Sequence, residues 1–288
     1  MSGGGVGERP RPDEGQAGPP GDRDRRYPLE LDEREVERYR VMAEQARAAE
    51  ADLWELAGIR PGARVADVGC GPGAMLPALS AAVGPEGRVE AVDADPAAVA
   101  AALALVAAAG LGNVSVAEGR ADRTGLEPGS LDVAMLRHVL AHNGGAEDAI
   151  VAHLADLVRP GGYVYLVDAD GTAMRTLPEH ADLADLAQRY QEFRAARGDD
   201  NRAGLRLADR LVRAGLEVAE FRGRYVIREL SSRLRSPAWA AREAMLAAGV
   251  ATEADVRRWD RAFQEMDAAP VRPTLFAPMF TAVGRRPA

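Results

Sequence analysis

The chain has 288 residues, and its 47% hydrophobic content is enough for the core of one large α/β domain. All 36 basic residues are arginines, so the chain cannot form a Walker A phosphate loop, a Schiff-base lysine or a pyridoxal phosphate site. The net charge of −8 argues against a nucleic-acid substrate. The single cysteine, Cys70, excludes an internal disulfide and a multi-cysteine metal site.

The N-terminal region divides into two segments. Residues 1–26 are rich in Gly, Pro, Arg and Asp, so we expect a disordered tail. Residues 27–57 have a helical pattern and are expected to form one or two helices of an N-terminal lid. No signal peptide and no apolar run of membrane-spanning length is visible, which favours a cytoplasmic protein that does not bind membranes.

Short apolar strands alternate with helices from residue 58 onward. Strands are expected at 64–68, 88–92, 114–117, 131–136 and 162–167, with helices at 74–83, 96–109 and 146–158 between them. This order predicts a doubly wound, mostly parallel sheet in an α/β core of residues 58–170. Residues 171–288 are expected to insert helices at 180–197, 203–214, 237–248 and 252–267. Strands at 216–221 and 275–283 would complete a seven-stranded Rossmann-like sheet.

A glycine-rich loop follows the first expected strand. It reads Val65-Ala-Asp-Val-Gly-Cys-Gly-Pro-Gly73, with glycines at positions 69, 71 and 73. Gly69, Gly71 and Gly73 permit a sharp turn and close approach of a ligand, and the next helix offers unpaired N–H groups. The carboxylate of Asp67 suits the cationic ammonium of S-adenosylmethionine (SAM) better than a dinucleotide pyrophosphate. Because the loop also satisfies the pattern G-x-G-x-x-G/A, a nicotinamide cofactor remains an alternative.

Two further acids follow the next two strands. Asp93 ends the second strand, about twenty residues after the glycine loop, where an acid can accept both hydroxyls of a ribose. Asp122 follows the third strand and could accept the exocyclic amine of an adenine, although a simple turn residue is a close alternative. Asp95 is expected to cap the helix that starts at Pro96.

Together these motifs resemble the class I SAM-dependent methyltransferases over residues 36–170, and more loosely to residue 286. The first motif of that family corresponds to 67–73, its ribose acid to Asp93, its adenine loop to Ala121-Asp122, its fourth strand to 131–136 and its pre-strand turn to 159–162. The adenine loop differs, since Arg120 stands where an acid is frequent. The resemblance implies cofactor contacts from Asp67, Gly69, Gly71, Gly73, Asp93, Ala94, Ala121, Asp122 and Arg137.

Within the family, the chain is similar to the branch that methylates small molecules in bacterial secondary metabolism and quinone methylation. No Asn-Pro-Pro-Tyr motif follows the fourth strand; Arg137-His-Val-Leu-Ala-His142 stands there instead. We expect a small-molecule substrate, no nucleic-acid partner, and a monomer or homodimer.

The candidate catalytic residues are His142, His138 and Asp168, at the expected ends of the fourth and fifth strands. His138 and His142 are four residues apart and could share one helical face. His142 is favoured as the base that removes a proton from the acceptor, with Asp168 as its orienting or alternative partner. The spacing also meets the minimum for zinc, but the H-E-x-x-H core is absent and methyl transfer needs no metal, so no metal is expected.

The sequence leaves three functional hypotheses open. A SAM-dependent methyltransferase is favoured, acting by in-line displacement on an oxygen, nitrogen or carbon atom of a small molecule. An NAD(P)-dependent oxidoreductase is permitted by the glycine spacing, but a Tyr-x-x-x-Lys dyad is impossible without lysine. A non-catalytic SAM-binding partner protein is the third.

Overall fold

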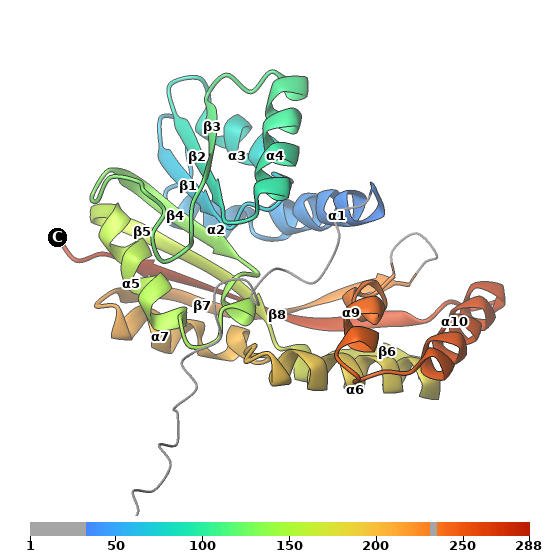
Figure 1. Ribbon diagram of the computed structural model, residues 1–288. Helices are drawn as coiled ribbons and strands as arrows, with labels where there is room; N and C mark the ends of the chain where they lie inside the picture. Colours follow the sequence, from blue (N-terminus) through green and yellow to red (C-terminus); the bar gives the residue numbers. More distant parts are fainter. Residues whose placement is uncertain (1–32, 231–234) are drawn as a thin grey trace, which may run out of the picture.

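Five parallel strands form one half of a large mixed sheet, and antiparallel strands extend it (Figure 1). A computed structural model describes residues 33–230 and 235–288. The expected tail of residues 1–26 and the start of the 27–57 segment lie outside these described residues. The strands are β1 (Arg64–Val68), β2 (Arg88–Asp93), β3 (Val114–Glu118), β4 (Leu131–Arg137), β5 (Val158–Ala169), β6 (Arg175–Leu177), β7 (Glu217–Glu229) and β8 (Thr274–Arg285).

The order in which the chain adds strands to the sheet reverses between β1 and β4, and these two strands are parallel. The order is β3-β2-β1-β4-β5-β8-β6, and β7 pairs with β8. In such open sheets, ligands bind outside the carboxyl ends of the strands at the point where the order reverses. The glycine loop after β1 and the histidines after β4 therefore lie at the same edge of the sheet.

The α/β architecture and the mostly parallel core are confirmed, but the sheet has eight strands within residues 33–230 and 235–288, and not seven. The additional strand, β6, has three residues and pairs with β8 through Arg175 and Phe276. A strand of this length is too short to produce a recognisable alternation of apolar and polar residues. The turn expected at 159–162 lies inside β5, where the pairing with β4 shifts register between Leu131 and Val133.

The helices follow the expected order. They are α1 (Glu33–Ala49), α2 (Ala51–Leu56), α3 (Leu76–Val83), α4 (Pro96–Ala109), α5 (Glu147–Leu157), α6 (Ala181–Ala196), α7 (Leu207–Arg213), α8 (Pro237–Ala240), α9 (Arg242–Ala247) and α10 (Glu253–Ala268). Asp95 caps α4 as predicted, its carboxylate accepting the N–H of Ala97 at 2.9 Å. The predicted start of α3 at residue 74 is wrong by two residues, because Ala74 still belongs to the turn that leaves the glycine loop.

The core consists of two apolar layers, one on each face of the parallel strands. One layer joins side chains from alternate positions of the strands, such as Val65 and Met135, to α2, α3 and α4. The other joins the intervening positions, such as Ala66 and Leu136, to α5 and α7. Because successive strand residues point to opposite faces, burial on both faces explains the nearly continuous apolar strand sequences. Among the described residues, no helix is long and apolar enough to cross a membrane.

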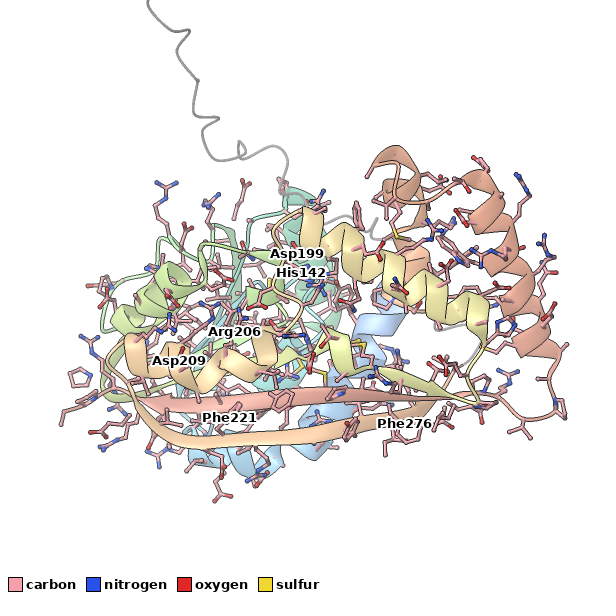
Figure 2. The ribbon with its side chains drawn as sticks, turned by 90° about the horizontal axis from the view of Figure 1, so that it is seen from below. His142, Asp199, Arg206, Asp209, Phe221 and Phe276 are labelled. Atoms are coloured by element: carbon pink, nitrogen blue, oxygen red, sulfur yellow. The ribbon has the colours of Figure 1, made fainter. Side chains whose placement is uncertain are left out.

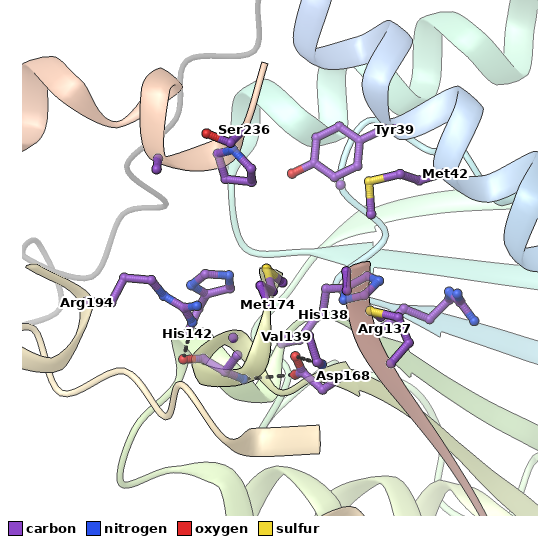
Figure 3. A pocket seen from close by; sticks show the side chains of 18 of the residues that line it. Tyr39, Met42, Arg137, His138, Val139, His142, Asp168, Met174, Arg194 and Ser236 are labelled. Atoms are coloured by element: carbon purple, nitrogen blue, oxygen red, sulfur yellow. Dashed lines mark hydrogen bonds between the residues drawn. The ribbon is translucent and has the colours of Figure 1, made fainter. Parts of the chain in front are cut away.

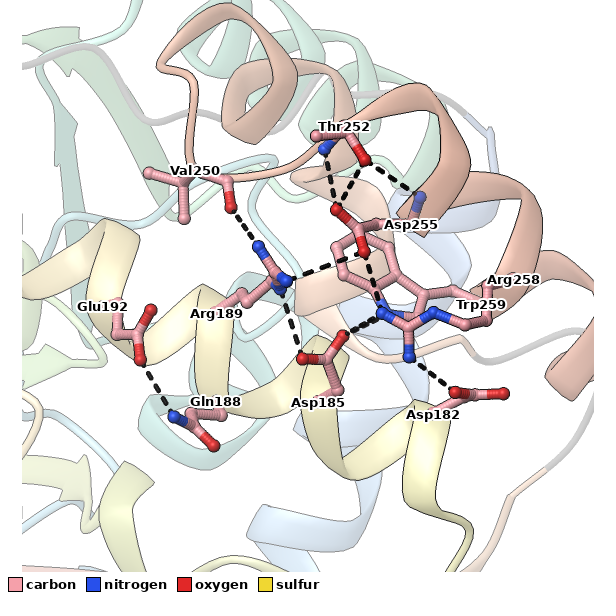
Figure 4. A network of polar contacts seen from close by, with 10 residues as sticks. All are labelled: Asp182, Asp185, Gln188, Arg189, Glu192, Val250, Thr252, Asp255, Arg258 and Trp259. Atoms are coloured by element: carbon pink, nitrogen blue, oxygen red, sulfur yellow. Dashed lines mark hydrogen bonds and ion pairs between the residues drawn. The ribbon is translucent and has the colours of Figure 1, made fainter.

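A third apolar cluster lies beyond the carboxyl ends of the strands and unites α6, α8, α9 and α10 around Trp259. A polar network fastens α6 to α10 at its margin (Figure 4). Arg258 of α10 donates to Asp185 at 2.7 Å and also pairs with Asp182, while the Trp259 indole donates to Asp185 at 2.9 Å. We call this group of helices the helical cap.

Candidate active site

The glycine loop folds back on the end of β2. Both Gly69 and Cys70 donate their N–H groups to the carbonyl of Val92, at 2.7 and 3.1 Å. Gly69 has a φ of 71°, and a Cβ there would lie 2.3 Å from the side chain of Val139, so side-chain packing requires glycine. Gly71 has a φ of 55° and nothing within 4 Å of its missing Cβ. Gly71 therefore leaves its backbone open to a ligand.

Two carboxylates flank the loop. Asp67 is 3% exposed, and burial raises the pKa of its carboxyl to about 7, although the guanidinium of Arg137 acts in the opposite direction. Asp93 accepts the N–H of Gly71 at 2.7 Å and the N–H of Asp95 at 2.9 Å. Its own pKa is also raised by burial. Asp93 thus braces the glycine loop, and each of its oxygens keeps further acceptor capacity for a ligand.

The segment after β3 contains an ion pair that the sequence motif alone did not indicate. The Nε and Nη2 atoms of Arg120 donate to the two carboxylate oxygens of Asp122 at 3.0 and 3.3 Å. The pKa of Asp122 is lowered by this contact. A ligand amine at Asp122 would therefore share the carboxylate with Arg120. Ala94 and Ala121 line the cavity described next.

A cavity of about 1520 Å³ runs from the glycine loop to the helical cap. Pockets for a single drug-sized ligand hold roughly 300–1,000 Å³, so this one has room for two ligands side by side. It is lined by every residue that the sequence predicted for the cofactor except Gly73, and by His138, His142 and Asp168. Figure 3 shows Tyr39 and Met42 of α1 on one side of it and the two histidines on the other.

Arg137 is held by a buried carboxylate that sequence reasoning missed. Glu50, at the junction of α1 and α2 and 1% exposed, accepts from Arg137 at 2.6 and 3.3 Å, from Tyr165 at 2.8 Å and from Arg224 at 2.9 Å. The pKa of Glu50 falls to about 2, because these three donors outweigh the penalty of burial. The contacts join the N-terminal helices to β4, β5 and β7 beside the glycine loop.

The two histidines do not share a helical face, so that part of the prediction is wrong. His138 directly follows β4. Its φ of 58° is a left-handed conformation, at which the chain turns away from the direction of the strand. His142 ends a short 3₁₀ segment, η2 (Leu140–His142). Both side chains nevertheless reach the cavity. Among the described residues, no group of three or more histidine, cysteine and acidic side chains could hold a metal ion.

Asp199 is the carboxylate hydrogen-bonded to His142, a contact that the sequence had suggested for Asp168. Its Oδ2 lies 3.2 Å from Nδ1 of His142 and also accepts from Nε of Arg194 at 2.9 Å (Figure 2). Asp168, 2% exposed, instead accepts the backbone N–H groups of Ala141 at 3.0 Å and Ala169 at 2.9 Å. Asp168 thus fixes the η2 segment, and Asp199 contacts the imidazole.

Comparison with known proteins agrees with this geometry. A family model described as a methyltransferase domain matches residues 65–162. Nocamycin O-methyltransferase of Saccharothrix syringae is 38% identical over 114 residues, which are 40% of this chain and 40% of that protein. The chain spans less than half the length of the curated relatives that it matches.

Solved structures show the same fold at low sequence identity. A candidate methyltransferase of Bacillus halodurans has a TM-score of 0.56 at 18% identity, covering 84% of this chain and 100% of that one. A Haemonchus contortus phosphoethanolamine N-methyltransferase, in complex with phosphomonomethylethanolamine and S-adenosylhomocysteine, has a TM-score of 0.50 at 15% identity, covering 83% and 52%. Residues 65–162 therefore match a methyltransferase domain, and the solved structures share the fold of this chain; both findings support a class I methyltransferase with SAM as its cofactor.

Proposed function

We propose that this protein transfers a methyl group from SAM to an oxygen, nitrogen or carbon atom of a small molecule of bacterial secondary metabolism. The observation that carries the proposal is the continuous cavity, which opens on the glycine loop at one end and on the helical cap at the other. Residues 58–170 would hold the cofactor, and α1 together with residues 171–288 would enclose the acceptor. The O-methyltransferase among the relatives supports a small-molecule acceptor.

The residues around the glycine loop fit the chemical groups of SAM. The open backbone at Gly71 gives close access, the buried carboxylate of Asp67 would meet the ammonium, and Asp93 would accept the ribose hydroxyls. Ala94, Ala121 and Asp122 would border the adenine. When bound, SAM supplies an electrophilic methyl group on a sulfonium.

His142 would remove the proton from the acceptor. When Nδ1 donates its hydrogen to Asp199, the remaining ring nitrogen, Nε2, is an acceptor. This tautomer is the one that a general base requires. Asp168 and Arg194 hold the surrounding backbone, since both bind groups of Ala141. The contribution of the chain is therefore alignment, exclusion of water by the helical cap, and proton removal.

A non-catalytic SAM-binding protein is the second candidate, because the glycine loop and the acids serve binding alone equally well. The test is incubation of the purified protein with deuteromethyl-labelled SAM and a panel of phenols, carboxylic acids and amines. Mass spectrometry then measures S-adenosylhomocysteine and deuteromethylated product. Labelled product above that of a Gly71→Val control supports the proposal; SAM binding without product from any acceptor class supports the alternative.

A further inference from the structure

Residues 119–124, which leave β3, form a tight loop at the wall of the cavity. All of them except the last line the cavity, including the two that are expected to border the adenine. The loop closes on itself, since a Cβ at Gly119 would lie 2.8 Å from the carbonyl oxygen of Thr124. The N–H of Gly119 donates to the carbonyl of Asp93 at 2.9 Å. The start of the loop is therefore fixed to β2, and its end at Thr124 requires a partner of its own.

His153 of α5 supplies that partner from outside the cavity. Its Nε2 atom accepts the backbone N–H of Thr124 at 3.1 Å and lies 2.9 Å from the Thr124 hydroxyl. The hydroxyl oxygen accepts the N–H of Leu126 at 3.2 Å, so the hydrogen of the hydroxyl can be donated to Nε2. Thr124 is 5% exposed, and neither it nor His153 lines the cavity. One ring nitrogen thus fixes the end of the loop.

These contacts require the ring of His153 to carry no hydrogen on Nε2. A backbone N–H can only donate, so the nitrogen that accepts from Thr124 must be unprotonated. A hydrogen added to Nε2 would point at the N–H of Thr124 and would leave that buried group without an acceptor. Protonation of His153 therefore breaks both of its contacts to Thr124 at once.

The surroundings of His153 favour the neutral ring. Burial lowers the pKa of His153, and the carboxylates of Asp156 on the same helix and of Asp122 in the loop act in the opposite direction without reversing the shift. Asp122 is itself paired with Arg120. Because the ring is protonated more easily once the loop is released, the held loop is favoured above the ordinary pKa of histidine and is progressively lost as the pH falls below it.

We propose that His153 is a positioning residue for the cofactor: its neutral ring holds residues 119–124 in the conformation that borders the adenine, and its protonation releases them. This inference rests on the proposed function for the identity of the ligand, but the state of the loop can be measured without any ligand. Coupling between two sites is reciprocal, so a ligand that needs the held loop also makes His153 harder to protonate. Loss of such a hydrogen bond corresponds to a fall in affinity of about three- to tenfold.

The experiment uses methylthioadenosine, which keeps the adenine and the ribose of SAM but has no ammonium for Asp67 to bind. Calorimetry measures its affinity at about pH 7.5 and about pH 5 for the full chain and for the variants His153→Gln and His153→Phe. Glutamine keeps an acceptor oxygen near the position of Nε2 and does not titrate, whereas phenylalanine removes the acceptor at every pH. Any titration of Asp93 is common to these proteins, so the ratio of the wild-type affinity to that of His153→Gln isolates the effect of His153.

Amide hydrogen exchange of residues 119–126 in the ligand-free proteins measures the loop itself. Wild type and His153→Gln are compared at the same pH, which removes the intrinsic pH dependence of the exchange reaction. The buried residues of β5 serve as the internal reference, because their exchange reports unfolding of the whole core.

We expect the ratio of the wild-type affinity to that of His153→Gln to fall about three- to tenfold between about pH 7.5 and about pH 5. His153→Phe should bind weakly at both values. At the lower pH, exchange of residues 119–126 should be faster in wild type than in His153→Gln, with β5 equal in the two proteins. A ratio that does not change with pH overturns the proposal, as does equal exchange of the loop at the lower pH.

Failure of every protein to bind methylthioadenosine at either pH would instead contradict the proposed function. The exchange comparison would then decide alone whether His153 holds the loop, since it needs no ligand.

Discussion

Asp67 is expected to couple SAM binding to pH. Its carboxyl has a pKa of about 7 in the free protein because it is buried. Below that pH the group is neutral and cannot pair with an ammonium, so affinity should rise by about tenfold between pH 5.5 and 7. Calorimetric titration with SAM across this range measures it. Asp67→Asn should bind more weakly and lose this rise; a flat wild-type profile would remove Asp67 from the ammonium site.

Asp93 combines two contributions, since it braces the backbone at Gly71 and Asp95 and is expected to accept the ribose hydroxyls. Asp93→Ala should therefore weaken SAM by about ten- to a hundredfold, the usual effect of losing hydrogen bonds to a charged group. The affinity for adenine should be almost the same in the variant and in the wild-type protein, because adenine carries no ribose. Undiminished SAM affinity in a folded Asp93→Ala protein would contradict the assignment.

His142 and Asp199 are expected to act as a pair. His142→Ala should lower the single-turnover rate by about 10²–10⁴-fold at saturating SAM, as removal of a general base does, while SAM affinity stays near wild type. Asp199→Asn should lower the rate at least tenfold, because an amide can donate to Nδ1 and so favour the wrong tautomer.

Asp168→Asn is the control for that pair. Asp199→Glu should keep part of the single-turnover rate that Asp199→Asn loses. If Asp168→Asn is slow while His142→Ala is fast, Asp168 holds the role assigned here to His142. If all of these variants turn over normally, the protein works by alignment alone.

At the residue scale, the motifs located the cavity wall but not the contacts behind it. Gly71, Asp93 and Asp122 could be found because they follow strands at recognisable spacings. Glu50 could not, since it meets Arg137 at a separation of 87 residues and nothing in the local pattern marks the pair. Asp199 likewise reaches His142 across 57 residues of chain. Long-range pairing of charged side chains has no signature in a single sequence.

At the element scale, Arg258 should contribute to the docking of α10 on α6. Its guanidinium contacts Asp182, Asp185 and Asp255, and the last two also pair with Arg189. The side chain is 33% exposed, so we expect Arg258→Met to lower the free energy of unfolding by only about 1 kcal/mol, and less at high salt.

Arg257→Met is the matched control for this prediction. Its side chain is 65% exposed and pairs with Glu253 at 3.7 Å. Unfolding in urea should show no change beyond about 0.5 kcal/mol for this variant. An equal effect of the two substitutions would mean that the network in Figure 4 does not fasten the helical cap.

Elements with strong local signals were predictable, and those shaped by tertiary pairing were not. The Asp95-Pro96 signal placed the start of α4 correctly. By contrast, β7 runs to Glu229, well beyond the expected end at 221, because β8 continues beside it and supplies hydrogen bonds to residues that line the cavity. Arg224 and Arg228 belong to this extension, so the strand face that they share could not be predicted from the sequence.

At the scale of the whole molecule, residues from the edge of the sheet, from α1 and from the helical cap line one cavity. The parallel half contributes the glycine loop and the acids that are expected to bind the cofactor, and the β7–β8 extension contributes Arg224 to the same cavity. We propose that the glycine-loop end of the cavity binds SAM and not a dinucleotide.

The most direct test of that claim is isothermal titration of the wild-type protein and Gly71→Val with SAM and, separately, with NADH. We predict that wild type binds SAM with a micromolar dissociation constant and does not bind NADH detectably. Gly71→Val should lose SAM, because a branched side chain would fill the open space beside the loop and is strained at a φ of 55°. Binding of NADH in preference to SAM, or unchanged SAM binding by Gly71→Val, would contradict the account.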